Sequence, residues 1–199
     1  MTLTAPMALG LAGCGKPAPS VREQEAAQTA SVATLSGWDR LFGAPQETIG
    51  AINQAGFALN KYSLANEDDF SPQGQIYVST GQPRMFSNSN AAKPNTTSVA
   101  VTGKTAAAID TVAYTLTLTD PVDATTARMR LAQTVGEFLG RFKIKASPDL
   151  LRAIRLGQPL DAAPAKVAIV PSTNGAPERI DVTFTRSPAT NPANNKTQG

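Results

Sequence analysis

The most regular pattern in the chain lies between Ile109 and Thr119, where the apolar residues valine, tyrosine and leucine alternate with threonine and alanine. A period of two residues is typical of a β-strand that buries one face and exposes the other. Shorter stretches of the same kind predict four more strands, at 75–81, 98–104, 166–170 and 178–185. Residues 87–97 are rich in asparagine, serine and proline and are predicted to form a loop.

Helical spacing follows the longest predicted strand. Asp120 is the expected N-cap of a helix, with Pro121 as its first residue. Five apolar residues fall on one face of this helix: Leu131, Val135, Phe138, Leu139 and Phe142. Ser147-Pro148 begins a second predicted helix, which ends at Gly157.

Two short helices are predicted before the first strand. Ser36 and Asp39 have the spacing of a capping box at the start of the first one. Pro45 is placed to begin the second helix, and Gly56 to end it.

The order of these elements predicts an α+β fold for residues 37–185. We expect one domain with a mainly antiparallel sheet of about five strands and helices packed on one face. The opposite face of the sheet would be rich in threonine. It could bind a partner or simply face solvent.

The segments on either side of the predicted domain are small and polar. Residues 14–36 lack a steady apolar period and are expected to form a flexible tether. A coil of that length spans about 25 Å from end to end. Residues 186–199 are predicted to be a disordered tail.

The content of ionisable residues excludes several classes of chemistry. The chain has no histidine, which excludes Ser-His-Asp and Cys-His catalysis and removes the commonest zinc ligand. The net charge of +3 falls to +1 over residues 37–185, where 14 Lys and Arg face 13 Asp and Glu. This balance argues against nucleic-acid binding.

The only cysteine, Cys14, ends an uncharged apolar run from Met1. A lone cysteine is often a buried core residue. However, Leu11-Ala12-Gly13-Cys14 resembles the lipobox of bacterial lipoproteins, in which a leucine and two small residues precede an invariant cysteine. The resemblance implies a signal peptide over residues 1–13, cleavage between Gly13 and Cys14, and a diacylglyceryl group on Cys14 Sγ.

The same resemblance implies a location. Two or three acyl chains on Cys14 would hold the protein stably at a membrane. In enterobacterial lipoproteins an aspartate after the cysteine favours the inner membrane, whereas this chain has Gly15. The implied location is the bacterial cell envelope, at the periplasmic face of the outer membrane. No cofactor is expected besides the covalent lipid.

A basic stretch lies on the two predicted helices between residues 128 and 155. It is opposed only by Glu137 and Asp149, which leaves a local excess of +5. Such a group could contact anionic lipid headgroups or an acidic partner, and it could also be an ordinary solvated helical face. Its members are Arg128, Arg130, Arg141, Lys143, Lys145, Arg152 and Arg155.

Carboxylates are the remaining candidates for acid-base or metal chemistry. The one tight cluster, Glu67-Asp68-Asp69, lacks the spaced ligands and the turn glycine of a calcium loop and is expected to be a solvated turn. We therefore expect no metal site and no catalytic residue.

These observations favour a non-catalytic interaction or assembly module that is anchored to the membrane and binds another envelope protein. A periplasmic carrier or sensor of a small ligand is the alternative, and an apolar pocket beneath the helix at 121–142 would favour it. A carboxylate-based cell-wall enzyme ranks below both. It would need two inward-facing acids in one cleft.

Overall fold

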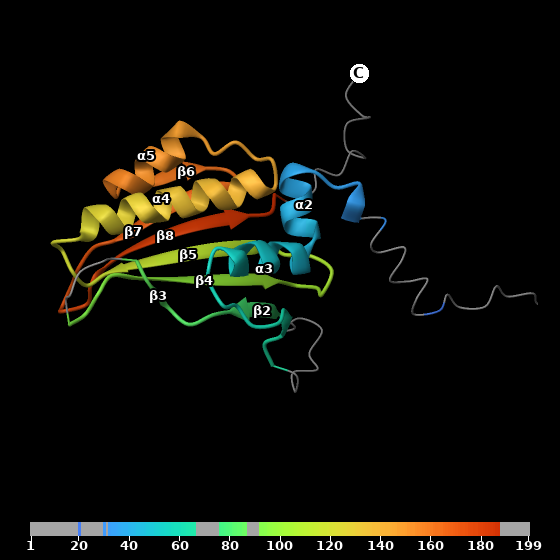
Figure 1. Ribbon diagram of the computed structural model, residues 1–199, viewed down its shortest axis with the longest axis horizontal. Coiled ribbons are helices and arrows are strands. Elements are labelled where there is room, and N and C mark those ends of the chain that lie inside the picture. The colour runs from blue at the N-terminus through green and yellow to red at the C-terminus, as the bar shows by residue number, and fades with distance from the viewer. Residues whose placement is uncertain (1–19, 21–29, 31, 67–75, 87–91, 188–199) are drawn as a thin grey trace, which may run out of the picture. The chain divides into compact units, whose positions relative to one another are not determined.

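An antiparallel sheet of eight strands forms the centre of the fold (Figure 1). The computed structural model describes Ser20, Ala30 and residues 32–66, 76–86 and 92–187, and the strands are counted within these ranges. Seven strands lie in the order β1-β2-β4-β5-β8-β7-β6, and β3 pairs with β4. Their bounds are β1 Ser63–Leu64, β2 Tyr77–Thr80, β3 Arg84–Met85, β4 Thr96–Gly103, β5 Thr111–Leu118, β6 Leu160–Ala162, β7 Ala165–Val170 and β8 Glu178–Thr185.

The alternation in the sequence matches burial along the central strands. In β5, Val112, Tyr114 and Leu116 are fully buried, while the threonines and alanine between them are half-buried on the opposite face. Tyr114 pairs with Val99 of β4 and with Val182 of β8, so the apolar residues of neighbouring strands face the same side. The strand predicted at 178–185 matches β8 in both bounds.

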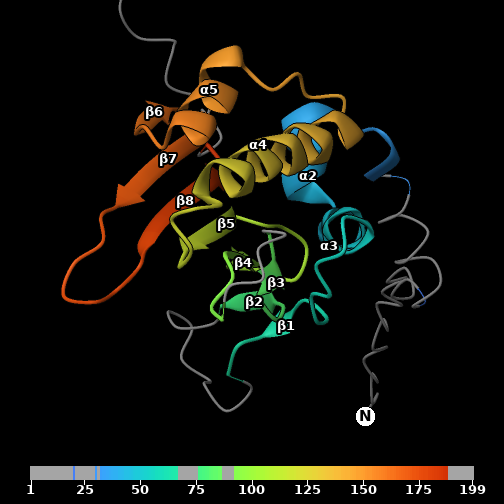
Figure 2. The ribbon, with the colours of Figure 1, turned by 60° about the vertical axis from the view of Figure 1, so that its left-hand side comes forward.

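Four helices among the described residues cover one face of this sheet (Figures 1 and 2). Mixed helix and strand content with an antiparallel sheet confirms the predicted α+β class. The sheet is larger than the five strands predicted because β1, β3 and β6 are only two or three residues long, too short for alternation to reveal them. The helices are α2 Gly37–Gly43, α3 Pro45–Gln54, α4 Ala124–Arg141 and α5 Pro148–Leu156.

The structure confirms the predicted start of α5 and contradicts that of α4. Helix α5 begins as expected, because the Ser147 hydroxyl accepts a hydrogen bond from Leu150 N at 3.1 Å. The predicted start of α4 at Pro121 is wrong. The Asp120 carboxylate instead accepts from Val122 N at 3.0 Å within a turn, and the helix begins three residues later. Ser36 makes no side-chain capping bond, so the predicted capping box is also wrong.

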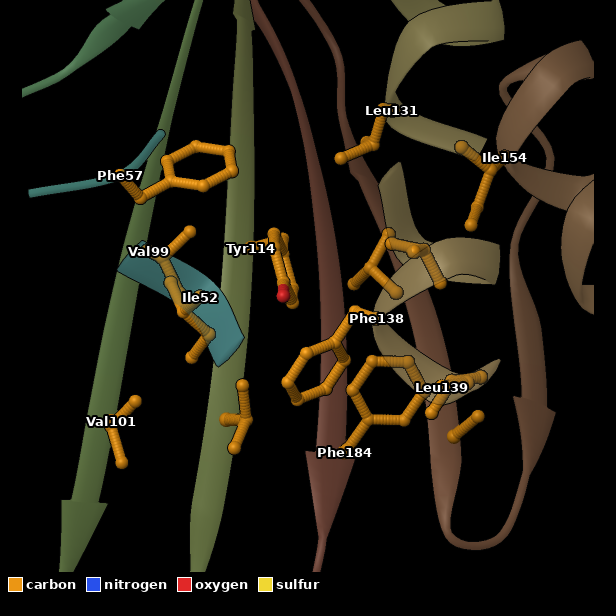
Figure 3. Packing of buried hydrophobic residues seen from close by; sticks show 14 of the residues in the cluster. Ile52, Phe57, Val99, Val101, Tyr114, Leu131, Phe138, Leu139, Ile154 and Phe184 are labelled. Atoms are coloured by element: carbon orange, nitrogen blue, oxygen red, sulfur yellow. The ribbon is translucent and has the colours of Figure 1, made fainter. Parts of the chain in front are cut away.

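Aromatic rings fill the space between the sheet and α4. Phe138 of α4 lies 5.7 Å from Tyr114, 6.4 Å from Phe184 and 5.5 Å from Phe142, measured between ring centroids. Figure 3 shows Tyr114, Phe138 and Phe184 gathered between the sheet and this helix. The region beneath α4 is therefore filled by side chains.

Tyr114 gives a direct test of this packing. It is fully buried, and its hydroxyl has no hydrogen-bond partner among the described residues. A buried hydroxyl without a partner costs roughly 1–3 kcal/mol. Tyr114→Phe is therefore expected to raise the free energy of unfolding by about 1 kcal/mol. Urea denaturation measures the change, and a loss of stability would mean that the hydroxyl has a partner.

The chain divides into two compact units, Met1–Thr34 and Leu35–Gly199, and the sheet belongs to the second. In that unit both ends of the described chain lie at the same end of the sheet. Trp38 of α2 lies 5.7 Å from Phe184 near the end of β8, and Arg186 N donates to Asp110 O at 2.8 Å. We call this the proximal end. The distal end is the opposite one, where Leu118 pairs with Glu178.

Candidate functional site

The seven basic residues that could contact anionic lipid headgroups or an acidic partner lie at several places on the domain. Arg128 lies at the distal end, where its guanidinium donates to Glu178 Oε1 at 2.7 Å and lies against Gly157 after α5. Its side chain is only 21% exposed. Arg128 therefore serves mainly to join α4 to β8. Arg130 lies elsewhere, in the wall of a groove beside α3.

The other five are exposed and lie at the end of α4, in the connection that follows it and on α5. Arg141 donates to the side-chain oxygen of Gln54, at the end of α3. Arg152 pairs with Asp149 at 2.7 Å on the surface of α5. The remaining three, Lys143, Lys145 and Arg155, are exposed.

A cleft of about 620 Å³ opens at the distal end. The Arg128–Glu178 ion pair forms part of its wall. Hydroxyl groups of Thr119, Thr125 and Ser172 supply further polar groups. The other lining residues are Lys93, Leu118, Pro121, Ala124, Gly175, Ala176 and Pro177.

Asn95 fixes the backbone beside this cleft. Its side-chain amide donates to Asp120 O at 3.0 Å, and its side-chain oxygen accepts from Asp120 N at 2.8 Å. Thr119 Oγ1 also donates to Pro94 O at 2.7 Å. These bonds join the connection between β5 and α4 to the segment that precedes β4. The sequence does not reveal this role, because Asn95 lies in a predicted loop and its partner is 25 residues away.

Asn95→Ala is expected to lower the free energy of unfolding by about 2–4 kcal/mol. Asn95 is fully buried and Asp120 nearly so, so the substitution leaves one backbone donor and one acceptor buried without their partner. Thermal unfolding followed by circular dichroism measures the change. Lys93→Ala, an exposed position nearby, is the control and should stay within about 0.5 kcal/mol of the wild type. Equal stability of the two variants would contradict the role of Asn95.

A smaller groove of about 320 Å³ lies between α4 and the C-terminal end of α3. Arg84 lines it, donates to Ala55 O and lies 5.9 Å from the Phe57 ring centroid. Together with Arg141 it places positive charge at the carbonyl end of α3, where cations stabilise a helix. Both arginines therefore stabilise the C-terminal end of α3 through these contacts.

The face of the sheet opposite the helices presents small, half-buried polar side chains. Thr115 Oγ1 donates to Asp181 Oδ1 at 2.9 Å across β5 and β8, and Arg179 pairs with Asp181 at 3.0 Å. Three neighbouring strands of eight residues and the six-residue β7 beside them give this face an area of about 500 Å². Its central residues are Thr96, Ser98, Ala100, Thr111, Ala113, Thr115, Thr117, Asp181 and Thr183. We call it the open sheet face.

Tyr62 and Tyr114 are held in their neutral form. Burial is the main cause that raises the pKa of Tyr62 to about 12, with smaller contributions from Asp110 and Tyr77. Burial likewise raises the pKa of Tyr114 far above its usual range. Tyr62 donates to Ala108 O at 2.9 Å. Neither hydroxyl is ionised near neutral pH, so neither is a ready general base or nucleophile.

Several predicted features lie outside the described residues: Gly13, Cys14, the cluster Glu67-Asp68-Asp69, most of the tether and most of the tail. The described residues hold no group of three or more acidic or cysteine side chains placed to bind a metal ion. Among them, no helix combines the length and the apolar character needed to cross a bilayer.

Comparison with known proteins gives no relative. No protein-family model, no curated protein and no solved structure matches this chain.

Proposed function

We propose that the chain is a lipid-anchored protein of the bacterial cell envelope whose domain binds another envelope protein and catalyses no reaction itself. The lipobox-like motif at Leu11–Cys14 supports the anchor. In this proposal the acyl chains on Cys14 hold the protein at the outer membrane, and the tether lets the domain reach its partner.

The observation that carries the binding role is the open sheet face. Helices cover one side of the sheet among the described residues (Figure 2). The other side presents threonine, serine, alanine and the paired Asp181 and Arg179 over about 500 Å². A stable interface buries about 800 Å² on each partner. The open sheet face supplies more than half of that area, and the sheet edges can add the rest. A folded protein with a flat polar surface is therefore the partner that fits.

The packing beneath α4 favours this proposal over a small-ligand carrier. A carrier requires a concave apolar site of about 300–1,000 Å³. The space beneath α4 is instead occupied by the rings of Tyr114, Phe138 and Phe184. The distal cleft and the smaller groove have volumes in this range, but charged and polar side chains form much of their walls. The interaction module therefore agrees better with the packing.

The distal cleft likewise gives little support to a carboxylate-based enzyme. Such an enzyme places two carboxyl groups across one cleft. Among the described residues that line the distal cleft, Glu178 is the one carboxylate, and it is paired with Arg128.

Site-specific photo-crosslinking in cells tests the proposal. A photoreactive residue replaces Thr115 at the centre of the open sheet face, in the chain that retains Cys14. The same residue at the exposed Arg155 on α5 is the matched control. We expect a discrete crosslinked protein, identified by mass spectrometry, from position 115 and not from position 155. Crosslinks from position 155 alone, or none from position 115, would contradict the proposed partner surface.

A further inference from the structure

Three cations lie together where α4 ends and the connection to α5 begins. Arg141 is the last residue of α4, and Lys143 and Lys145 follow in the connection. All three side chains are exposed, and among the described residues neither lysine forms an ion pair. We call these three residues the proximal cation group.

A chain of ring contacts places this group at the proximal end. Phe142, inside the group's span, contacts Phe138, which contacts Phe184, which in turn contacts Trp38 of α2. Figures 1 and 2 both show the end of α4 beside α2. Because residue 36 directly precedes α2, the cations lie at the end of the domain at which the tether is attached.

Nearby acidic groups do not neutralise these cations. Asp149 at the start of α5 already pairs with Arg152. Glu137, one turn before Arg141, accepts a hydrogen bond from Gln133 and, among the described residues, forms no ion pair with any of the three cations. The group therefore presents its charges to solvent, unlike Arg128 and Arg179, which are paired with acids nearer the distal end.

Lys143 occupies a backbone position that favours glycine. Its φ is +58°, and the bonds Lys143 N to Gly140 O at 2.9 Å and Ile144 N to Leu139 O at 3.0 Å form a Schellman motif. A side chain is unfavourable in this left-handed conformation. Attraction between the ammonium group and the last carbonyls of α4 offsets part of the cost.

We infer that the proximal cation group contacts the anionic phospholipid headgroups of the membrane that carries the anchor. This inference rests on the proposed lipid anchor, since a tether of about 25 Å keeps the proximal end close to the bilayer. Exposed side chains that line neither of the two clefts described above suit a fluid surface of headgroups rather than one shaped peptide. The contact would turn the distal end, about 25 Å away along the strands, toward the periplasm.

Vesicle binding by the unlipidated chain tests the contact. The full chain with Cys14→Ser is mixed with vesicles of phosphatidylethanolamine containing about one third phosphatidylglycerol, or with vesicles that lack the anionic lipid. Lys143→Gly and Lys145→Gln together remove two charges from the group. Lys93→Gln and Arg155→Gln together remove two exposed charges elsewhere and are the matched control. All variants share the same N-terminal and C-terminal segments, so charges there contribute equally.

Each cation near an anionic surface raises the affinity for that surface about fivefold. Loss of two cations should therefore lower the affinity for anionic vesicles about 25-fold. High salt should weaken wild-type binding in the same way. Lys143→Gly should also raise the midpoint of thermal unfolding by about 2–4 °C, which separates lost binding from lost folding. Equal binding by the two double variants, or no preference of the wild type for anionic vesicles, would overturn the inference. Neither result depends on whether Cys14 is lipidated in cells.

Discussion

Replacing Phe138 with alanine is expected to lower the free energy of unfolding by about 3–5 kcal/mol. Phe138 is 2% exposed and joins three other rings, those of Tyr114, Phe142 and Phe184. The substitution removes apolar contacts and leaves a cavity that the sheet and α4 cannot readily close. A domain of this size is stable by about 5–15 kcal/mol, so a large share of its stability depends on this ring.

Urea denaturation followed by circular dichroism measures this loss. Met129→Ala on the same helix is the matched control, because Met129 is 50% exposed. It should change the free energy of unfolding by less than about 0.5 kcal/mol. Similar losses in the two variants would mean that α4 does not pack on the sheet through Phe138.

Replacing Cys14 with serine is expected to move the protein almost entirely from the membrane fraction to the soluble fraction. Serine has no thiol, so it cannot form the thioether that the lipobox resemblance implies. Stable attachment to a bilayer needs two or more acyl chains, each contributing about 0.8 kcal/mol per buried methylene group. The cations of the proximal group would add only about 1 kcal/mol each.

Cell fractionation with immunoblotting measures this change. Gly15→Ser, the neighbouring position, retains the thiol and should remain in the membrane fraction. A Cys14→Ser protein that stays in the membrane fraction after a high-salt wash would contradict the lipid anchor.

Elements with a strong local pattern were predicted well from the sequence. The alternation between residues 109 and 119 predicts β5, and Ser147-Pro148 with Gly157 predicts both ends of α5. Elements held by distant partners were missed. Strand β3, for example, consists of Arg84 and Met85 and exists through its pairing with β4. A strand of two residues has no period that the sequence could reveal.

The candidate surfaces also differ in how far a local pattern predicts them. The sequence predicted a basic region on the two long helices, but spacing along a helix does not reveal which cations have acidic partners elsewhere. Arg128 pairs with Glu178, 50 residues away, whereas Lys143 remains exposed beyond the end of α4. The threonine-rich face followed directly from alternation, because a strand places successive side chains on opposite faces.

The most direct test of membrane anchoring is the intact mass of the protein extracted from bacterial membranes. We expect a chain that begins at Cys14, lacks residues 1–13 and carries covalently bound acyl chains. A chain that begins at Met1 and carries an unmodified thiol at Cys14 would contradict it.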